Sequence, residues 1–258
     1  TDVRGIIINL GSTNSTVVRN SITNLSGTSA GITVTGIQNN AGLGSNLFCA
    51  NNMIINVSSI GTGTQSNISR GIASTNSSNS GDKYYFNTVI MMGQDGSSAN
   101  TSYATGFDFT VGTQTSFSLL NNNVYQSLIH SAALAKSFCV RLNNRPQAWN
   151  SNYNNFYCID PNPGEAQHLF FVGEILVSDS ITINGWRTLA QGGRDANSIS
   201  KDPKFVASND GHLLSTRPET PLNEAGTSLQ EVSTDIDGQA RTSHPDIGAD
   251  EVDVVNSI

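Results

Sequence analysis

Two aspartates near the C-terminal end of the chain have the spacing of cation ligands. Asp235 and Asp237 alternate in the sequence D-I-D-G. Alternating carboxylates before a glycine can wrap around a hard cation such as Ca²⁺, because glycine permits the sharp turn that makes the oxygens converge. The distal glutamate of a full calcium loop is missing. A second interpretation therefore stays open, in which the aspartates fix a tight turn and Arg241 pairs with Asp246 or Glu251.

Aromatic residues in polar segments are candidates for binding sugars. Trp149 follows an Arg-Pro pair closely, and Tyr153 lies shortly after it. An exposed ring offers a flat apolar face on which a sugar can stack, and large exposed aromatic residues often mark a binding surface. The alternative is that both rings pack inside the fold. Trp149 and Tyr153 are therefore the candidate residues for a polysaccharide or another surface ligand.

The coil-forming part of the chain, residues 1–160, carries few groups suited to catalysis. A lyase needs several acidic metal ligands and a base, and a glycoside hydrolase needs two carboxylates at a fixed separation. The carboxylates of this region stand at non-equivalent places, at Asp2, Asp82, Asp95, Asp108 and Asp160. We expect Asp108 to pair with Arg141 at an exposed site, where such a pair stabilises the fold only slightly. No catalytic residue is assigned.

Composition excludes several classes of partner. The 258 residues carry a net charge of −7, and only 13% of them are charged, against about 25% in a typical globular domain. No basic stripe is present, which argues against nucleic acid. No apolar run approaches the roughly 20 residues of a membrane span. Because the chain opens directly into a strand pattern, we expect it to be part of a longer chain with other domains.

The three cysteines do not form a disulfide framework or a metal knuckle. They are Cys49, Cys139 and Cys158. Buried thiols are expected for all three, although Cys139 and Cys158 could form a disulfide if their strands lie side by side.

A repeat organises the chain from its start to about position 160. An asparagine recurs at regular intervals, and an apolar residue stands two positions after each. The recurring residues are Asn20, Asn52, Asn87, Asn122 and Asn154, so the steps in residue number are 32, 35, 35 and 32. A second series of short apolar strands lies between them, in segments that begin at Gly5, Gly31, Gly71, Gly106 and Phe138.

This repeat predicts an all-β fold, a right-handed parallel β-helix. Coils of about 32–35 residues cannot bury their apolar faces alone, whereas stacked coils place like residues about 4.8 Å apart. The asparagine would sit at a bend, tolerate a left-handed backbone and bond the next asparagine in a ladder. A β-sandwich is the alternative, but it gives no reason for this register.

The pattern relaxes after Cys158. Residues 168–172 and 174–177 predict one more coil, and residues 181–183 a further strand. Asn184 could then cap a short helix that carries Trp186 and Leu189. We divide the chain into coils at 1–183 and a less regular C-terminal capping segment at 184–258.

Six ordered motifs in residues 184–252 resemble the closing part of β-helix domains in large secreted surface proteins of bacteria. They are Trp186, then G-x-D-A-N-S-I from Gly193, D-P-x-F from Asp202, G-H-L from Gly211, T-P-x-x-x-A-G-T from Thr220, and D-x-D-G-x-x-R from Asp235 with D-I-G-A-D-E from Asp246. Thr220 stands where that family usually has serine.

The resemblance implies an extracellular or cell-surface module of adhesins or of polysaccharide-processing proteins, and no particular reaction. We therefore expect a structural or adhesive module that contacts polysaccharide. The alternative is a polysaccharide lyase or glycoside hydrolase of the same fold.

Overall fold

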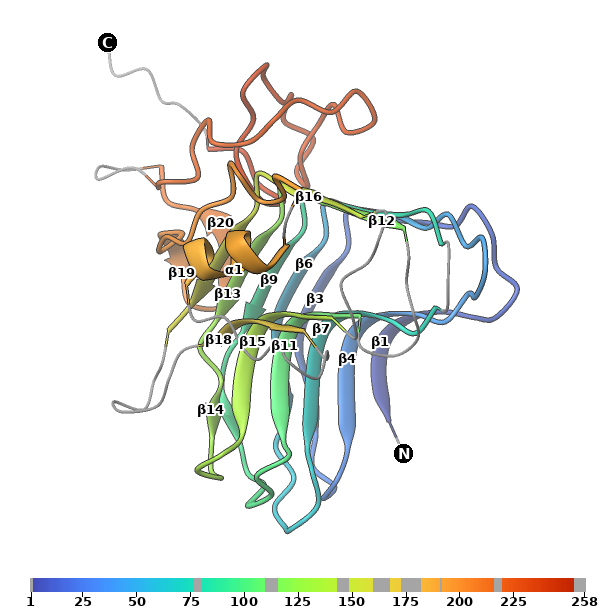
Figure 1. Cartoon of the computed structure of the whole chain (residues 1–258), viewed down its shortest axis with the longest axis vertical. Coiled ribbons are helices and arrows are strands. Elements are labelled where there is room, and N and C mark those ends of the chain that lie inside the picture. The colour runs from blue at the N-terminus through green and yellow to red at the C-terminus, as the bar shows by residue number, and fades with distance from the viewer. Residues whose placement is uncertain are drawn as a thin grey trace.

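The chain winds into a stack of parallel β-coils (Figure 1). A computed structural model describes residues 2–76, 80–109, 116–142, 149–159, 168–172, 182–190, 192–215 and 220–252. Its regular structure is β-strand except for helix α1 (Ile183–Ala190). No helix among the described residues has the length and apolar character needed to cross a bilayer.

Each of the first five coils contributes one strand to each of three parallel sheets, and β18 adds a sixth strand to the first sheet. The first sheet has the order β1 (Val3–Ile8), β4 (Thr33–Asn39), β7 (Ile68–Ser74), β11 (Tyr103–Phe109), β15 (Lys136–Leu142) and β18 (His168–Val172). The second has β2 (Thr16–Val18), β5 (Phe48–Ala50), β8 (Asp82–Tyr85), β12 (Phe117–Leu120) and β16 (Asn150–Asn152). The third has β3 (Ser21–Gly27), β6 (Met53–Ser59), β9 (Thr88–Met91), β13 (Asn123–Gln126) and β17 (Asn155–Cys158).

Two smaller pairs complete the sheets. Strands β10 (Gln94–Asp95) and β14 (Ile129–His130) are parallel, whereas β19 (Phe205–Ala207) and β20 (Asp210–Leu213) form an antiparallel hairpin. Strands one coil apart pair in parallel register, as Ile37 does with Ile72 and Ile72 with Phe107. The predicted parallel β-helix is confirmed, and the β-sandwich is wrong.

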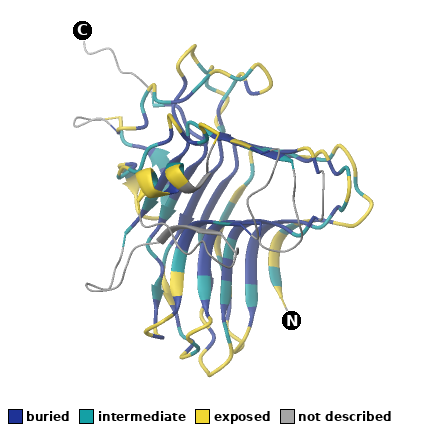
Figure 2. Cartoon of the chain, in the orientation of Figure 1, coloured by how far each residue is buried: buried dark blue, intermediate teal, exposed yellow. Residues whose placement is uncertain are grey.

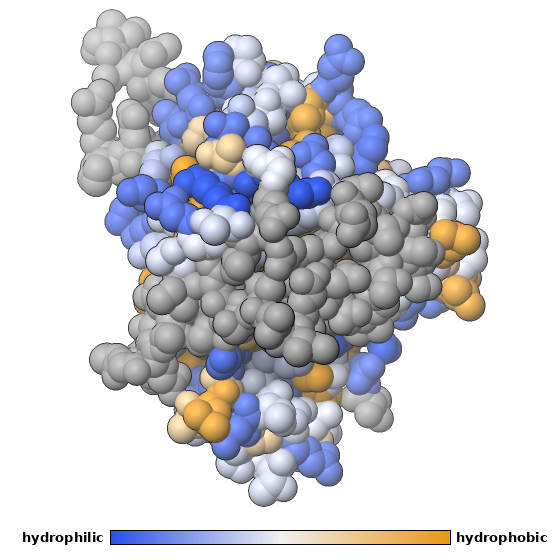
Figure 3. Space-filling model, in the orientation of Figure 1, coloured by the Kyte–Doolittle hydropathy of each residue, from blue (hydrophilic) through white to orange (hydrophobic). Residues whose placement is uncertain are grey.

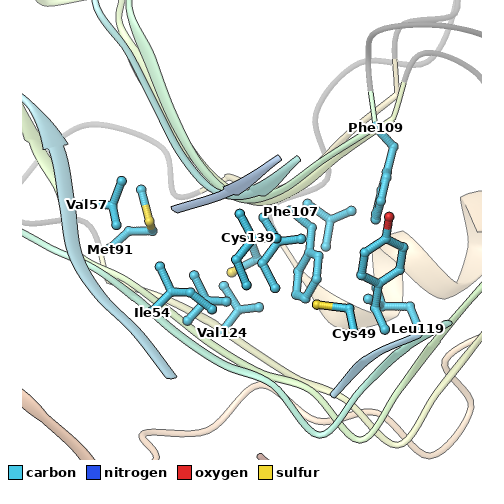
Figure 4. Close-up of a cluster of buried hydrophobic side chains, with 14 of the residues drawn as sticks. Cys49, Ile54, Val57, Met91, Phe107, Phe109, Leu119, Val124 and Cys139 are labelled. Carbon is cyan, nitrogen blue, oxygen red and sulfur yellow. The ribbon is translucent and has the colours of Figure 1, made fainter. Parts of the chain in front are cut away.

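The core fills the space enclosed by the three sheets (Figure 4). Like residues meet across coils, and Ile54, Val89, Val124 and Phe156 form one fully buried row. The middle coils are almost completely buried, whereas much of the first coil is exposed (Figure 2). Cys49, Cys139 and Cys158 are buried free thiols, as the sequence predicts.

The predicted asparagine ladder runs through the stack. Asn52 Nδ2 donates to Asn87 Oδ1 at 2.9 Å, and Asn87 Nδ2 donates to Asn122 Oδ1 at the same distance. Asn20 and Asn154 extend the row at its two ends, at 2.9 and 3.1 Å. Each acceptor oxygen also takes the backbone N–H of the preceding asparagine in the row. The ladder therefore satisfies backbone groups that the bend would otherwise leave unpaired.

The left-handed backbone at this bend belongs to the residue before each ladder asparagine, which corrects the prediction. We call these residues the bend residues: Arg19, Asn51, Phe86, Asn121 and Tyr153, with φ between 53° and 57°. The side chains of Asn51, Phe86 and Asn121 are buried against C-terminal residues that flank the stack.

The predicted alignment of the second series of repeats, the glycine-led strands of the first sheet, was wrong at one coil. The equivalent of Gly5 and Gly71 is Gly36 and not Gly31, because Arg4 pairs with Thr35 and Ile37 with Ile72. The glycine is required by close packing. A Cβ at Gly71 would lie 2.3 Å from Val89 Cγ1 and 2.7 Å from the Gly106 carbonyl oxygen.

Residues 182–190 and 192–201 cover the end of the coil stack. Thr182, and not Asn184, caps α1, because its Oγ1 accepts the N–H of Gly185 at 3.0 Å. The helix begins at Ile183, so the predicted strand at 181–183 is wrong for that residue. Trp186 is fully buried, and its Nε1 donates to Asp195 Oδ2 at 2.7 Å. Residues 174–177 lie outside the described part.

Residues 220–252 lie along the flank of the stack, where they contact bend residues of several coils. Asn121 exchanges hydrogen bonds with Thr227 on both its amide atoms, each at 2.9 Å. Asn51 donates to Thr234 O at 2.7 Å and accepts from Arg241 at 2.8 Å. The Arg241 guanidinium also stacks 3.8 Å above the Phe86 ring. This flanking segment thus ties several coils together.

Candidate functional site

A polar groove of about 500 Å³ opens on the outer side of the second sheet. Strands β5 and β8 contribute Phe48 and Lys83, and the turns before β2, β5 and β8 contribute the polar wall. Glu231 reaches the groove from the flanking segment. The groove is lined by Asn14, Ser15, Asn46, Phe48, Gly81, Lys83 and Glu231.

Turn residues of successive coils form one wall of this groove. Asn14, Asn46 and Gly81 have φ values of 52°, 45° and 66°, so each turn uses the same left-handed conformation. Asn46 Nδ2 donates to Asn14 Oδ1 at 3.3 Å, and both residues are exposed. The stacking of coils therefore places the side-chain amides of Asn14 and Asn46 next to each other along the groove.

An aromatic ring and an ion pair complete the groove. Phe48 is half-buried, and its ring meets Tyr85 edge to face at a centroid distance of 6.1 Å. Lys83 Nζ lies 2.6 Å from Glu231 Oε1, with both side chains well exposed. The hydrogen bond to Glu231 raises the pKa of Lys83. The groove thus combines an apolar face with amides and both signs of charge, which suits a polar, hydroxyl-rich ligand.

Hydrophilic residues predominate on the described part of the face in Figure 3. Hydrophobic residues gather there in separate small groups within a mostly hydrophilic surface. A protein partner that binds by apolar contact would require a larger continuous patch.

Trp149 is not an exposed platform, which corrects its assignment as a ligand-binding residue. It is 5% exposed, and its ring packs against Phe117 at 5.4 Å and Trp186 at 5.7 Å. The helix that carries Trp186 covers this end of the stack, so the indole is part of the core. Tyr153 is half-exposed at the last bend, away from the groove, and its role in binding stays a prediction.

Asp235 fixes a turn, as the second interpretation of the D-I-D-G motif holds. Its Oδ1 accepts the N–H groups of Asp237 and Gln239 at 3.0 and 2.8 Å, and its Oδ2 accepts that of Glu251 at 3.0 Å. Three backbone bonds occupy this buried carboxylate. The Asp237 side chain points elsewhere, toward His212, with Oδ2 3.0 Å from Nε2. A calcium site shared by Asp235 and Asp237 does not fit this geometry.

Arg241 pairs with Glu251, as the same interpretation expects. The two side chains are buried, with exposed fractions of 3% and 9%. Arg241 NH2 also donates to Gly248 O at 2.9 Å. Burial raises the pKa of Glu251 to about 7 despite the neighbouring guanidinium.

Asp108 and Arg141 do pair, but the prediction of an exposed site is wrong. The Asp108 side chain is 1% exposed and lies between Arg70, at 2.7 Å, and Arg141, at 3.7 Å. Tyr103 donates to the same carboxylate oxygen at 3.0 Å, and the Arg141 guanidinium stacks 3.6 Å from the Tyr103 ring. The side chains of three coils thus bury the carboxylate.

The remaining described carboxylates of the middle coils are also engaged. Asp82 accepts hydrogen bonds from Asn39 and Asn76 at 3.0 and 3.2 Å and from the N–H of Leu47 at 2.9 Å. Asp95 accepts from Asn67 at 2.7 Å. Asp160 lies outside the described residues.

Sequence reasoning missed a hydrogen-bonded row of Asp95, His130 and Ser137. His130 Nδ1 is 3.0 Å from Asp95 Oδ2, and its Nε2 is 3.1 Å from Ser137 Oγ. The Ser137 hydroxyl donates to Leu128 O at 3.0 Å, and its equivalent two coils earlier, Ser69, accepts the backbone N–H of Ser59 at the end of β6. We interpret the row as a structural corner. The only indication of this row in the sequence was that His130 stands 35 residues, or one coil, after Asp95.

The chain matches no protein-family model, no curated protein and no solved structure. The class of protein is therefore defined by its fold, a parallel β-solenoid. The resemblance to bacterial surface β-helix domains stays a prediction.

Proposed function

We propose that the chain is a structural and adhesive module of a bacterial extracellular surface protein, and that it contacts polysaccharide through the groove between Phe48, Lys83 and Glu231. The observation that carries the proposal is the pair of exposed turn amides, Asn14 and Asn46, that lines the same groove as Phe48. Sugars offer hydroxyl groups to such amides and apolar ring faces to such aromatic residues.

The rigidity of the stack supports an adhesive role. Coils are joined by three parallel sheets, by the asparagine ladder and by a flanking segment that contacts the bend residues. A groove built on such a frame keeps its shape without a ligand, so binding requires little ordering of the protein.

The alternative function, a polysaccharide lyase or glycoside hydrolase, finds less support among the described residues. Both reactions use carboxylates that face the substrate. Asp82, Asp95 and Asp108 are instead buried and held by neighbouring side chains. In the groove, Glu231 is the carboxylate, and its partner is Lys83.

A glycan array combined with product analysis tests the proposal. We expect retention of one class of polysaccharide without new reducing ends or unsaturated uronates. Release of either product from the retained glycan would overturn the adhesive function in favour of the enzymatic one. Failure to retain any glycan would contradict the proposed ligand.

A further inference from the structure

Three parts of the C-terminal segment bring potential metal ligands together. His212 comes from the β19–β20 hairpin, Asp237 from the D-I-D-G turn, and Asp250 from the stretch that follows the buried Ile247. One ligand atom from each residue lies within 4.8 Å of the other two. His212 Nε2 and Asp237 Oδ2 lie 3.0 Å apart in a hydrogen bond, and a shift of a few tenths of an ångström would place both atoms about 2.1 Å from one tetrahedral ion.

The imidazole of His212 is oriented as in many metal sites. Its Nδ1 faces the Asp210 carboxylate, whose Oδ1 also accepts the His212 backbone N–H at 3.0 Å. A carboxylate on one ring nitrogen fixes the ring orientation and leaves the other nitrogen directed at the ion. Here that other nitrogen, Nε2, faces Asp237.

Asp250 is a buried carboxylate that lacks a strong counter-ion. The residue is only 5% exposed, and its Oδ2 accepts one backbone N–H, from Leu213 at 2.7 Å. Within the described ranges, no Lys or Arg contacts it, although the adjacent Glu251 pairs with Arg241. A cation at this position would compensate the carboxylate.

We propose that His212, Asp237 and Asp250 bind a first-row divalent cation of the zinc type, with Asp210 as the residue that positions the histidine. One imidazole nitrogen and two carboxylate oxygens suit zinc, and they leave a coordination position for water. Calcium prefers oxygen ligands alone. His212 and Asp237 are 40% and 54% exposed on their side chains, so the ion can enter from solvent while Asp250 forms the floor.

The ion would join three segments that are separate in the sequence. It would link the β19–β20 hairpin to the turn at Asp237 and to Asp250, and so stabilise the flanking segment against the coils. A ligand that binds only the folded state raises the free energy of unfolding, and the increase grows with the logarithm of the ratio of ligand concentration to dissociation constant.

Calorimetric titration of the whole chain tests this site. The protein is prepared without a histidine tag, stripped with a chelator and dialysed, and Zn²⁺, Mn²⁺ and Ca²⁺ are titrated separately. We expect one Zn²⁺ per chain, weaker Mn²⁺ binding, and a rise in melting temperature with Zn²⁺. Tighter binding of Ca²⁺ than of Zn²⁺ would overturn the proposed chemistry.

Substitutions identify the ligands. Asp237 is exposed, so Asp237→Asn leaves the fold intact and should raise the Zn²⁺ dissociation constant at least about 100-fold, whereas Asp210→Asn should raise it about 10-fold. His244→Ala, an exposed histidine of the same segment, is the matched control and should change nothing. Equal affinities for Asp237→Asn and His244→Ala would contradict the site.

Co²⁺ absorption gives a second readout that does not depend on stability. The visible spectrum of the Co²⁺-loaded chain should change on His212→Gln and not on His244→Ala. An unchanged spectrum for His212→Gln would show that the histidine is not a ligand. Neither measurement uses glycan binding, so the site and the proposed function can fail independently.

Discussion

Ser198 continues the asparagine ladder beyond the last coil. Its Oγ accepts the backbone N–H of Asn154 at 2.9 Å, the same bond that each ladder asparagine makes to the one before it. Ser198 in turn donates to Asp195 Oδ1 at 2.6 Å, and the other oxygen of that carboxylate receives the Trp186 indole. The ladder thus ends on a hydroxyl and a carboxylate and not on unpaired groups.

Ser198→Ala should therefore destabilise the end of the stack. The variant leaves the buried N–H of Asn154 without an acceptor, which costs about 1–3 kcal/mol. Urea unfolding measures the change. Ser208→Ala, at an exposed serine of the same segment, should shift the free energy by less than about 0.5 kcal/mol. Equal effects of the two variants would contradict this role.

Asn87→Ala should be more damaging than Asn20→Ala. Asn87 is fully buried, and its side chain accepts two hydrogen bonds from Asn52 and donates one each to Asn122 Oδ1 and Cys49 O. Its loss should lower the free energy of unfolding by about 2–4 kcal/mol, against about 1 kcal/mol at the partly exposed Asn20. Chemical denaturation of both variants measures the two losses in the free energy of unfolding. A larger loss for Asn20→Ala would show that burial does not determine how much a ladder asparagine stabilises the fold.

Phe48→Ala should weaken polysaccharide binding at least about 10-fold, because the groove loses its aromatic face while its amides remain. The ligand retained on the glycan array serves as the probe in a titration. Leu43→Ala removes an exposed apolar residue outside the groove and should leave affinity unchanged. If only Leu43→Ala lowered the affinity for the polysaccharide, the binding surface would lie outside the groove.

Asp250→Asn should remove part of the pH dependence of stability when a chelator is present. Burial raises the pKa of Asp250 from 3.8 to about 6 in the folded chain. A carboxyl with a raised folded pKa stabilises the fold below its unfolded pKa, and that contribution disappears as pH rises through about 6. Between pH 4 and pH 7, the free energy of unfolding of the natural chain should fall by about 1–3 kcal/mol relative to that of the variant.

Thermal or urea unfolding at both pH values measures this difference. His212, Asp235 and Asp237 face the same carboxylate. Burial opposes the charge on His212, but the hydrogen bond to Asp210 and the nearby carboxylates raise the pKa of the histidine above its ordinary value. His212→Gln in the same buffers therefore separates the contribution of the imidazole. Parallel pH profiles for the natural chain and Asp250→Asn would contradict the raised pKa.

The coil register was predictable where one residue type repeats. The asparagine row and the apolar row from Ile54 to Phe156 follow from a regular spacing, because stacking requires like residues to meet. The glycine series failed at one coil because a Gly-Ile pair occurs at both Gly31 and Gly36. Loop length, which carries no pattern, decides between them.

The site was less predictable because it depends on contacts between distant segments. Nothing in the local sequence shows that α1 would cover Trp149, or that Glu231 would reach Lys83 from so far along the chain. Asp108 alternates with apolar residues and so was assigned to an exposed face. Its burial comes from arginines one coil away on either side.

Side-chain amide contacts in solution test the central claim, that coils stack with like residues in register. In a deuterated, nitrogen-labelled sample, nuclear Overhauser effects should connect the side-chain amide of Asn87 to those of Asn52 and Asn122 and continue to Asn20 and Asn154. Absence of this series, with cross-peaks typical of paired antiparallel strands in its place, would contradict the account.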